Sequence, residues 1–195
     1  MWDVITSRPI PSLNIELNFL VPLHNSHIME ELIQQWRKNA AKSEDVNYRF
    51  VKWTKSISSP RVDRLAKETD AQVFEKIDCT RCAHCCQTLQ PAFTDTDIAR
   101  ISRHLGQPRT DFTHTFLEKD EFGEMLMNRL PCAFLVETGH CSIYDVRPNG
   151  CRDYPNTQKS DFSQRAFAHS MNTVTCPAVY HILEVMKQRI GYRDK

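Results

Sequence analysis

Apolar residues recur every three or four positions in three segments that precede a dense run of cysteines, and this spacing predicts three amphipathic helices. Ser59 and Pro60 fit the start of the third helix, as an N-cap residue and a proline at the first helical position. Trp36 and Trp53 fall at core-facing positions and need no cofactor to explain them. The three apolar stripes are Met29, Leu32, Ile33, Trp36 and Ala40; Val46, Phe50, Trp53 and Ile57; and Val62, Leu65, Ala66, Val73 and Ile77.

Two more helices are predicted after the cysteine run. The first starts at 94–97, where a threonine is followed by acidic residues in the first turn, and it ends at Gly106 and Pro108. Thr110 is the expected cap of the second helix. The residues expected to be buried are Ile98, Ile101 and Leu105 in the first helix and Phe112 and Phe116 in the second.

A β-hairpin and a C-terminal helix complete the predicted elements. Segments 132–136 and 141–144 are rich in strand-forming residues and are separated by a short insert, so each arm of the hairpin would carry a cysteine. Apolar residues from Val179 to Met186 predict the last helix, with Cys176 and Pro177 in its first turn. The predicted fold class is therefore α+β and mainly helical, with a cysteine-rich loop core and a short β-hairpin clamped by flanking helices.

The chain divides into three expected regions. Residues 1–27 lack a sustained period and carry two Xaa-Pro bends, which predicts either a disordered arm or sequence upstream of a start at Met29. Residues 28–78 form a helical N-terminal segment, and residues 79–195 form a cysteine-cluster metal-binding domain.

Composition narrows the functional classes. The 195 residues include 25 basic and 24 acidic side chains, and this balance provides no field to attract a phosphate backbone, so we expect no nucleic-acid partner. No stretch approaches the roughly 20 apolar residues of a membrane span, and the N-terminus lacks the features of a signal peptide. We therefore expect a cytoplasmic protein without a membrane partner.

The cysteines are the main chemical signal. Four lie within eight residues, which is denser than packing requires, whereas a soft metal needs several converging thiolates. Disulfides are disfavoured in a reducing compartment, and pairs this close in sequence would need strained short loops. We expect metal ligation by all eight: Cys79, Cys82, Cys85, Cys86, Cys132, Cys141, Cys151 and Cys176.

The spacing suggests a division into two sets. A Cys-x-x-Cys-x-x-Cys run supplies three ligands to an iron–sulfur cube whose fourth comes from a distant cysteine, often followed by proline, and Cys176 has that form. At the positive end of the last helix, Cys176 would also be favoured as a thiolate. Cys86 would point away from Cys85, toward a second set with Cys132, Cys141 and Cys151. A single centre with the other cysteines as buried thiols is the alternative.

Ligand type does not separate an iron–sulfur cluster from zinc, because both accept four thiolates. Arg147 and Arg152 flank Cys151 and could offset the charge of a thiolate-bound cofactor or grip a substrate anion, or they could belong to a solvated turn with Asp145 and Asp153 as ion-pair partners. His84 and His140 also lie beside cysteines, but with eight thiols available we do not expect them to be ligands.

These residues resemble the YkgJ-type CxxCxxCC cysteine-cluster family, which is named for zinc or iron chelation. The resemblance runs from Cys79 to Cys176 and includes the segments 132–135, 139–144 and 147–155. It implies metal binding and no particular reaction. The flagellin lysine methylases are similar in the CxxCxxCC segment, and that resemblance implies an iron–sulfur cluster, but this chain is far shorter and has no recognisable segment for S-adenosylmethionine.

Three functions therefore stay open. The first is an iron–sulfur protein with a redox role, the second is a zinc-stabilised binding module, and the third is a cluster-dependent enzyme that transfers methyl groups to protein lysine, with Arg147 and Arg152 near its substrate.

Overall fold

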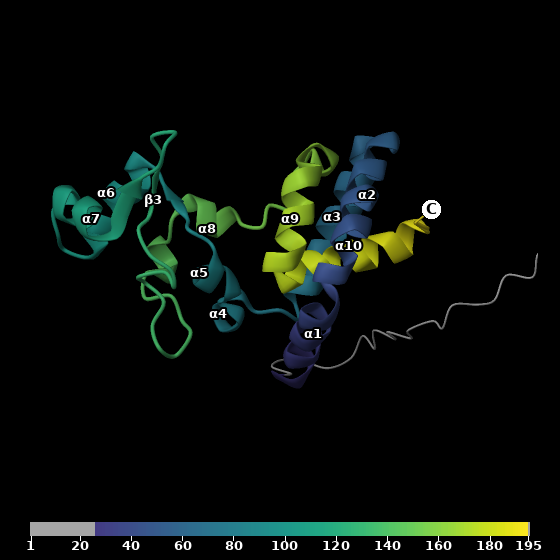
Figure 1. Cartoon of the computed structure of the whole chain (residues 1–195), viewed down its shortest axis with the longest axis horizontal. Coiled ribbons are helices and arrows are strands. Elements are labelled where there is room, and N and C mark those ends of the chain that lie inside the picture. Colours follow the sequence, from purple (N-terminus) through teal and green to yellow (C-terminus); the bar gives the residue numbers. More distant parts are fainter. Residues whose placement is uncertain (1–25, 195) are drawn as a thin grey trace, which may run out of the picture.

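The computed structural model describes residues 26–194, which form a helical part and a part with a small sheet (Figure 1). Short helices and loops that carry most of the cysteines lie between the two parts. The architecture is α+β and mainly helical, as the sequence predicts.

The helical part is built from five helices that bury their apolar stripes against one another. α2 packs on α9, and α10 packs on α3, α9 and α1. Its largest core includes Phe50, Phe162 and Leu183, all essentially without exposed surface. The helices are α1 (Ser26–Asn39), α2 (Glu44–Trp53), α3 (Ser59–Phe74), α9 (Ala166–Thr175) and α10 (Pro177–Ile190).

This core contains residues from both sides of the domain boundary that the sequence suggests near residue 78. Val62 and Ala66 on α3 pack with Ile182 and Met186 on α10. The helical segment 28–78 thus shares its core with the end of the chain. Residues 1–25, most of the expected arm, lie outside the described residues.

The second part is a three-stranded antiparallel sheet with two helices. β3 is the central strand, with Leu126 opposite both Ala92 and Glu118. Phe112 stacks on Phe134 with ring centroids 6.1 Å apart, and these rings lie in a second, smaller core. The elements are β1 (Ala92–Phe93), α6 (Asp95–His104), α7 (Arg109–Phe116), β2 (Leu117–Lys119) and β3 (Met125–Met127).

The segments between the two parts are short. They are the helices α4 (Cys79–Cys82), α5 (His84–Thr88) and α8 (Asn149–Asp153), with the 3₁₀ turn η3 (Tyr144–Val146) before α8. Figure 1 shows α4, α5 and α8 between the small sheet and the helical part. Three further 3₁₀ turns belong to the helical part: η1 (Ala41–Ser43), η2 (Thr54–Ser56) and η4 (Phe162–Arg165).

Buried Asp97 fixes the start of α6 against the loop before α8. Thr94 and Asp97 form a reciprocal capping box, in which each side chain accepts a hydrogen bond from the other residue's backbone N–H. Asp97 also accepts hydrogen bonds from Arg100 at 2.6 Å and from the Asn149 backbone N–H at 3.1 Å. Burial alone would raise the pKa of Asp97, but these hydrogen bonds outweigh it and the net shift is downward.

Several local predictions from the sequence are wrong. Ser59 is the first residue of α3, and Ser58 precedes the helix without a side-chain cap. Thr110 lies inside α7, which Pro108 precedes. Leu105 and Trp53 are each 38% exposed, because Leu105 ends α6 at the surface and Trp53 packs sideways on Tyr192.

The predicted hairpin is reduced to a single bridge between Leu135 and Cys141. The backbone N–H of Val136 donates to His140, and that of Ser142 donates to Phe134, so the chain does reverse there. The sheet itself is formed elsewhere, by strands of two or three residues that are too short to give a repeating pattern.

Trp36 anchors α1 to α9 and gives a first testable prediction. Its indole Nε1–H donates to the Thr173 carbonyl at 2.7 Å in a buried setting. Trp36→Phe should lower the free energy of unfolding by about 1–3 kcal/mol, because it leaves a buried carbonyl unpaired and removes packing. Denaturant unfolding followed by circular dichroism measures the change. Trp53→Phe is the matched control, and an equal loss in both variants would contradict the anchoring role.

Within the described part of the chain, every helix falls short of the length or the apolar character that a membrane crossing requires.

Candidate metal centre

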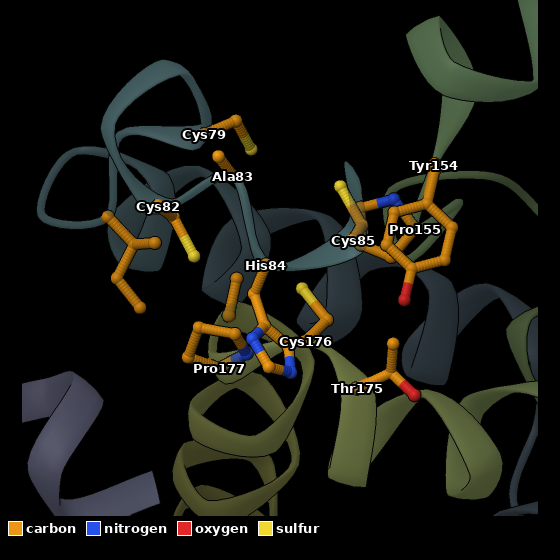
Figure 2. Close-up of a pocket in the computed structure, with 12 residues that line it drawn as sticks. Cys79, Cys82, Ala83, His84, Cys85, Tyr154, Pro155, Thr175, Cys176 and Pro177 are labelled. Carbon is orange, nitrogen blue, oxygen red and sulfur yellow. The ribbon is translucent and has the colours of Figure 1, made fainter. Parts of the chain in front are cut away.

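Four cysteines from three segments line one cavity of about 30 Å³. Cys79 and Cys82 lie on α4, Cys85 lies on α5, and Cys176 immediately precedes α10. Figure 2 shows their sulfur atoms turned toward a common space between α4, α5 and the start of α10. We call these residues the first cysteine group. They are the set that the sequence spacing assigns to an iron–sulfur cube.

The backbone around this group turns sharply enough to present three sulfurs from seven residues. Asp78 caps α4 by accepting a hydrogen bond from the Thr80 backbone N–H at 2.8 Å. Ala83 then adopts a left-handed conformation, with φ of 47°, which ends α4 and allows α5 to begin at once. A left-handed alanine costs about 1–2 kcal/mol, so the surrounding contacts hold it in place.

Backbone N–H groups donate to several of the sulfurs. The donors are those of His84 to Cys82, of Ala178 and Val179 to Cys176, of Phe134 and Leu135 to Cys132, and of Ile143 to Cys141. Such donors stabilise thiolates and, in iron–sulfur proteins, raise the reduction potential of the cluster.

Cys176 lies at the start of α10, where the helix is expected to favour its thiolate form. Its sulfur does accept hydrogen bonds from the first turn of α10, but the residue is only 8% exposed, and burial raises its pKa to about 12. The start of α10 therefore acts in the expected direction, but burial outweighs it, and the net shift of the Cys176 pKa is upward. A metal would have to displace its proton.

The remaining four cysteines form a second cysteine group beside the small sheet. Cys86 lies on α5 and Cys151 on α8, while Cys132 and Cys141 pack against the second core. The Cys132 backbone N–H donates to the Cys86 carbonyl at 2.8 Å. Burial raises the pKa of Cys151 to about 12, and the other three thiols of the group add to this increase.

Cys85 and Cys86 form the junction between the two groups. They are consecutive in α5, and a hydrogen bond between their side chains contributes most to the raised pKa of Cys86. Cys85 therefore lines the cavity of the first group, whereas Cys86 belongs to the second group. The two groups are adjacent in space as well as in sequence.

Of the two arginines that the sequence singles out, only Arg147 affects the thiols. Its charge lowers the pKa of Cys79, Cys141 and Cys151 against the stronger effect of burial, which places Arg147 beside both groups. Its guanidinium stacks on the Tyr144 ring at 3.9 Å and donates to the Tyr144 carbonyl at 2.7 Å.

Arg152 instead donates to the Asp145 backbone carbonyl at 3.4 Å and is exposed. The ion pairs that the sequence suggested with Asp145 and Asp153 are not formed in the described residues, where Asp153 pairs with Lys159 at 2.6 Å.

The two neighbouring histidines differ. His84 lines the first cavity, and its ring packs edge-on against Trp36 with centroids 4.8 Å apart. His140 is exposed, and its Nδ1 contacts the Thr138 carbonyl at 3.1 Å.

Tyr154 is a site residue that the sequence reasoning missed. It lines the first cavity, and its hydroxyl donates to the Asn172 side chain at 3.2 Å. Burial raises the pKa of Tyr154, and the neighbouring thiols of the first group add to the shift. Tyr154 falls within segment 147–155 of the family resemblance, and this was the available signal.

Between residues 26 and 194, no three His, Cys, Asp or Glu side chains form a ready-made site for a metal ion. Binding in the first group would therefore have to draw the sulfurs closer than they lie here. The role of the eight cysteines as ligands stays a prediction.

The comparisons with known proteins give one match. Residues 78–176 match the family model described as "CxxCxxCC: Putative zinc- or iron-chelating domain". This range contains all eight cysteines. Searches of curated proteins and of solved structures found no match.

Proposed function

The chain belongs to the CxxCxxCC family of zinc- or iron-chelating domains, which supports metal binding, and we propose that Cys79, Cys82, Cys85 and Cys176 hold an iron–sulfur cluster. The protein would use this cluster in one-electron redox chemistry. The family description covers zinc or iron chelation, so the iron–sulfur cluster and its redox reaction are our proposal.

The observation that carries the proposal is the convergence of four sulfurs from separate segments on one cavity. Cys79, Cys82 and Cys85, together with a distant Cys-Pro pair at Cys176, have the ligand spacing of an iron–sulfur cube, and this spacing favours a cluster over a lone ion. Backbone N–H donors at Cys82 and Cys176 are the kind of second-layer contact that tunes a cluster.

A redox role is supported by the neighbourhood of the first group. Arg147 lies beside both cysteine groups and would offset the negative charge that thiolates and sulfide bring. All eight cysteines are free thiols, which suits a reducing compartment such as the cytoplasm.

Zinc is the second candidate, and the second cysteine group favours it. That group borders a core of only eight buried residues, which is small for independent stability. A tetrahedral zinc ion held by Cys86, Cys132, Cys141 and Cys151 would stabilise this part of the chain. In this form the protein would be a zinc-stabilised binding module.

Analysis of protein purified without oxygen separates the two candidates. An iron–sulfur cluster predicts brown protein, broad absorption in the visible range, and iron with an equal amount of acid-labile sulfide. A zinc module predicts colourless protein that retains zinc and loses structure in chelator. Colourless protein without iron and sulfide would contradict the iron–sulfur proposal, and protein without any metal would contradict both.

A further inference from the structure

The first cysteine group has one open edge. Cys79 is the exposed residue of the four, although its thiol lines the cavity and is partly desolvated there, whereas Cys176 is buried. An electron entering or leaving a cofactor held there would pass most directly through the side of Cys79 and Cys82. The charges around that edge therefore bear on which redox partner can approach.

The last turn of α1 lies directly beside this edge. Cys82 packs on the apolar cluster that contains Ile33 and Trp36, and the Trp36 ring contacts His84 at 4.8 Å between centroids. The next residue, Arg37, is exposed and follows Trp36 directly in the last turn of α1. Figure 1 shows α1 next to α4. A helix far away in sequence thus brings a cation to the group.

Two more exposed cations lie on the same two elements, α1 and α4. Lys38 follows Arg37 in the last turn of α1, and Arg81 lies within α4 between Cys79 and Cys82. Exposed Asp78 accepts hydrogen bonds from the backbone N–H and hydroxyl of Thr80, and its charge raises the pKa of Cys79 and Cys82, so it offsets one of these three cations. We call Arg37, Lys38 and Arg81 the basic rim.

We propose that the basic rim is the docking surface for a negatively charged one-electron carrier, an acidic redox protein that exchanges electrons with the first group across its Cys79 edge. This inference rests on the proposed function, because it needs a redox centre in the first group. A local excess of positive charge raises the encounter rate of anionic partners by about 10- to 1000-fold at low ionic strength. The chain as a whole carries a net charge of only +1, so the effect would come from this edge and not from the overall charge.

Small redox ions of opposite charge probe the surface without a known partner. Protein reduced under anaerobic conditions transfers one electron to ferricyanide, which becomes ferrocyanide, or to tris(phenanthroline)cobalt(III), which becomes the cobalt(II) complex. The first oxidant is an anion and the second a cation. We expect the second-order rate constant for ferricyanide to fall as ionic strength rises, because salt screens the attraction, and the rate constant for the cobalt complex to rise.

Charge reversal localises the effect. Arg37→Glu, and the double variant Arg37→Glu/Arg81→Glu, should slow oxidation by ferricyanide about tenfold or more at low salt and speed oxidation by the cobalt complex. Arg61→Glu is the matched control: Arg61 is an exposed arginine on α3 in the helical part, outside the basic rim. It makes the same change in net charge and should alter both rates little. An unchanged absorption spectrum verifies that each variant keeps its cofactor. If the double variant fails to assemble, the single variant Arg37→Glu still tests the proposal, because Arg37 lies outside the cysteine loop.

The outcomes separate the two proposals. Protein that accepts no electrons from dithionite would overturn the redox function, and the docking surface with it. Protein that is reducible but whose rates in Arg37→Glu match those of Arg61→Glu would overturn the docking surface alone.

Discussion

The Cys82→Ser variant is expected to lose the cofactor of the first cysteine group. Cys82 contributes one of the four sulfurs around the cavity, and serine is a hard oxygen ligand that soft metals bind poorly. Loss of a group that merely orients a ligand lowers metal affinity about 10- to 100-fold, so loss of a ligand should cost at least as much. Iron and sulfide content with visible absorption, measured on anaerobic protein, should fall to a small fraction of the wild-type values.

His84→Ala is the matched control for this substitution. His84 lies in the same loop and lines the same cavity, but its ring packs against Trp36 and is not expected to be a ligand. The variant should keep its metal, with some loss of stability from the missing ring contact. Full metal content in Cys82→Ser, or metal loss in His84→Ala alone, would contradict the ligand set. Cys151→Ser should leave the cofactor of the first group in place, because Cys151 belongs to the second group.

The second large effect is expected at Asp97. Asp97→Ala should lower the free energy of unfolding by about 3 kcal/mol, because it removes a buried carboxylate and leaves the Asn149 backbone N–H and the Arg100 guanidinium without that partner. The Arg100 side chain is 31% exposed, so water compensates part of the loss. Urea unfolding of the metal-loaded protein measures the difference, with Asp95→Ala as a control in the same helical turn.

The same residue predicts a dependence on pH. Because the folded protein lowers the pKa of Asp97 from its ordinary 3.8, the ionised carboxylate contributes stability above pH 3.8, and this contribution is lost as the pH falls through the folded pKa. Asp97→Asn has the same shape and cannot ionise in this range. Its unfolding free energy should therefore fall less steeply below pH 4 than that of the wild type, and parallel curves would contradict the role of the carboxylate.

Helices with a long apolar stripe were predictable from the sequence. The stripes led to α1, α3 and α10, because burial of one face repeats every three to four residues over 14 to 16 residues. The strands could not be found in this way. β1 has two residues, and β2 and β3 have three each, so alternation has no length over which to appear.

The candidate site was predictable from two local motifs, the Cys-x-x-Cys-x-x-Cys run at 79–85 and the Cys-Pro pair at 176–177. The structure brings Cys79, Cys82 and Cys85 to one cavity with Cys176, the arrangement that the spacing suggested. The approach of Arg37 was not predictable, because it depends on how Trp36 packs between α9 and the cysteine loop. Such contacts between distant segments leave no local pattern in a single sequence.

The position of Cys176 at the head of α10 bears on how the protein is made. The second cysteine group is complete once Cys151 has emerged from the ribosome, whereas the first stays one sulfur short for 25 more residues of synthesis. Cys79, Cys82 and Cys85 would spend that interval as an incomplete site exposed to stray metals. If the first group holds the proposed cluster, its insertion would depend on the arrival of α10, and a nascent chain that fails to dock this helix would lack it.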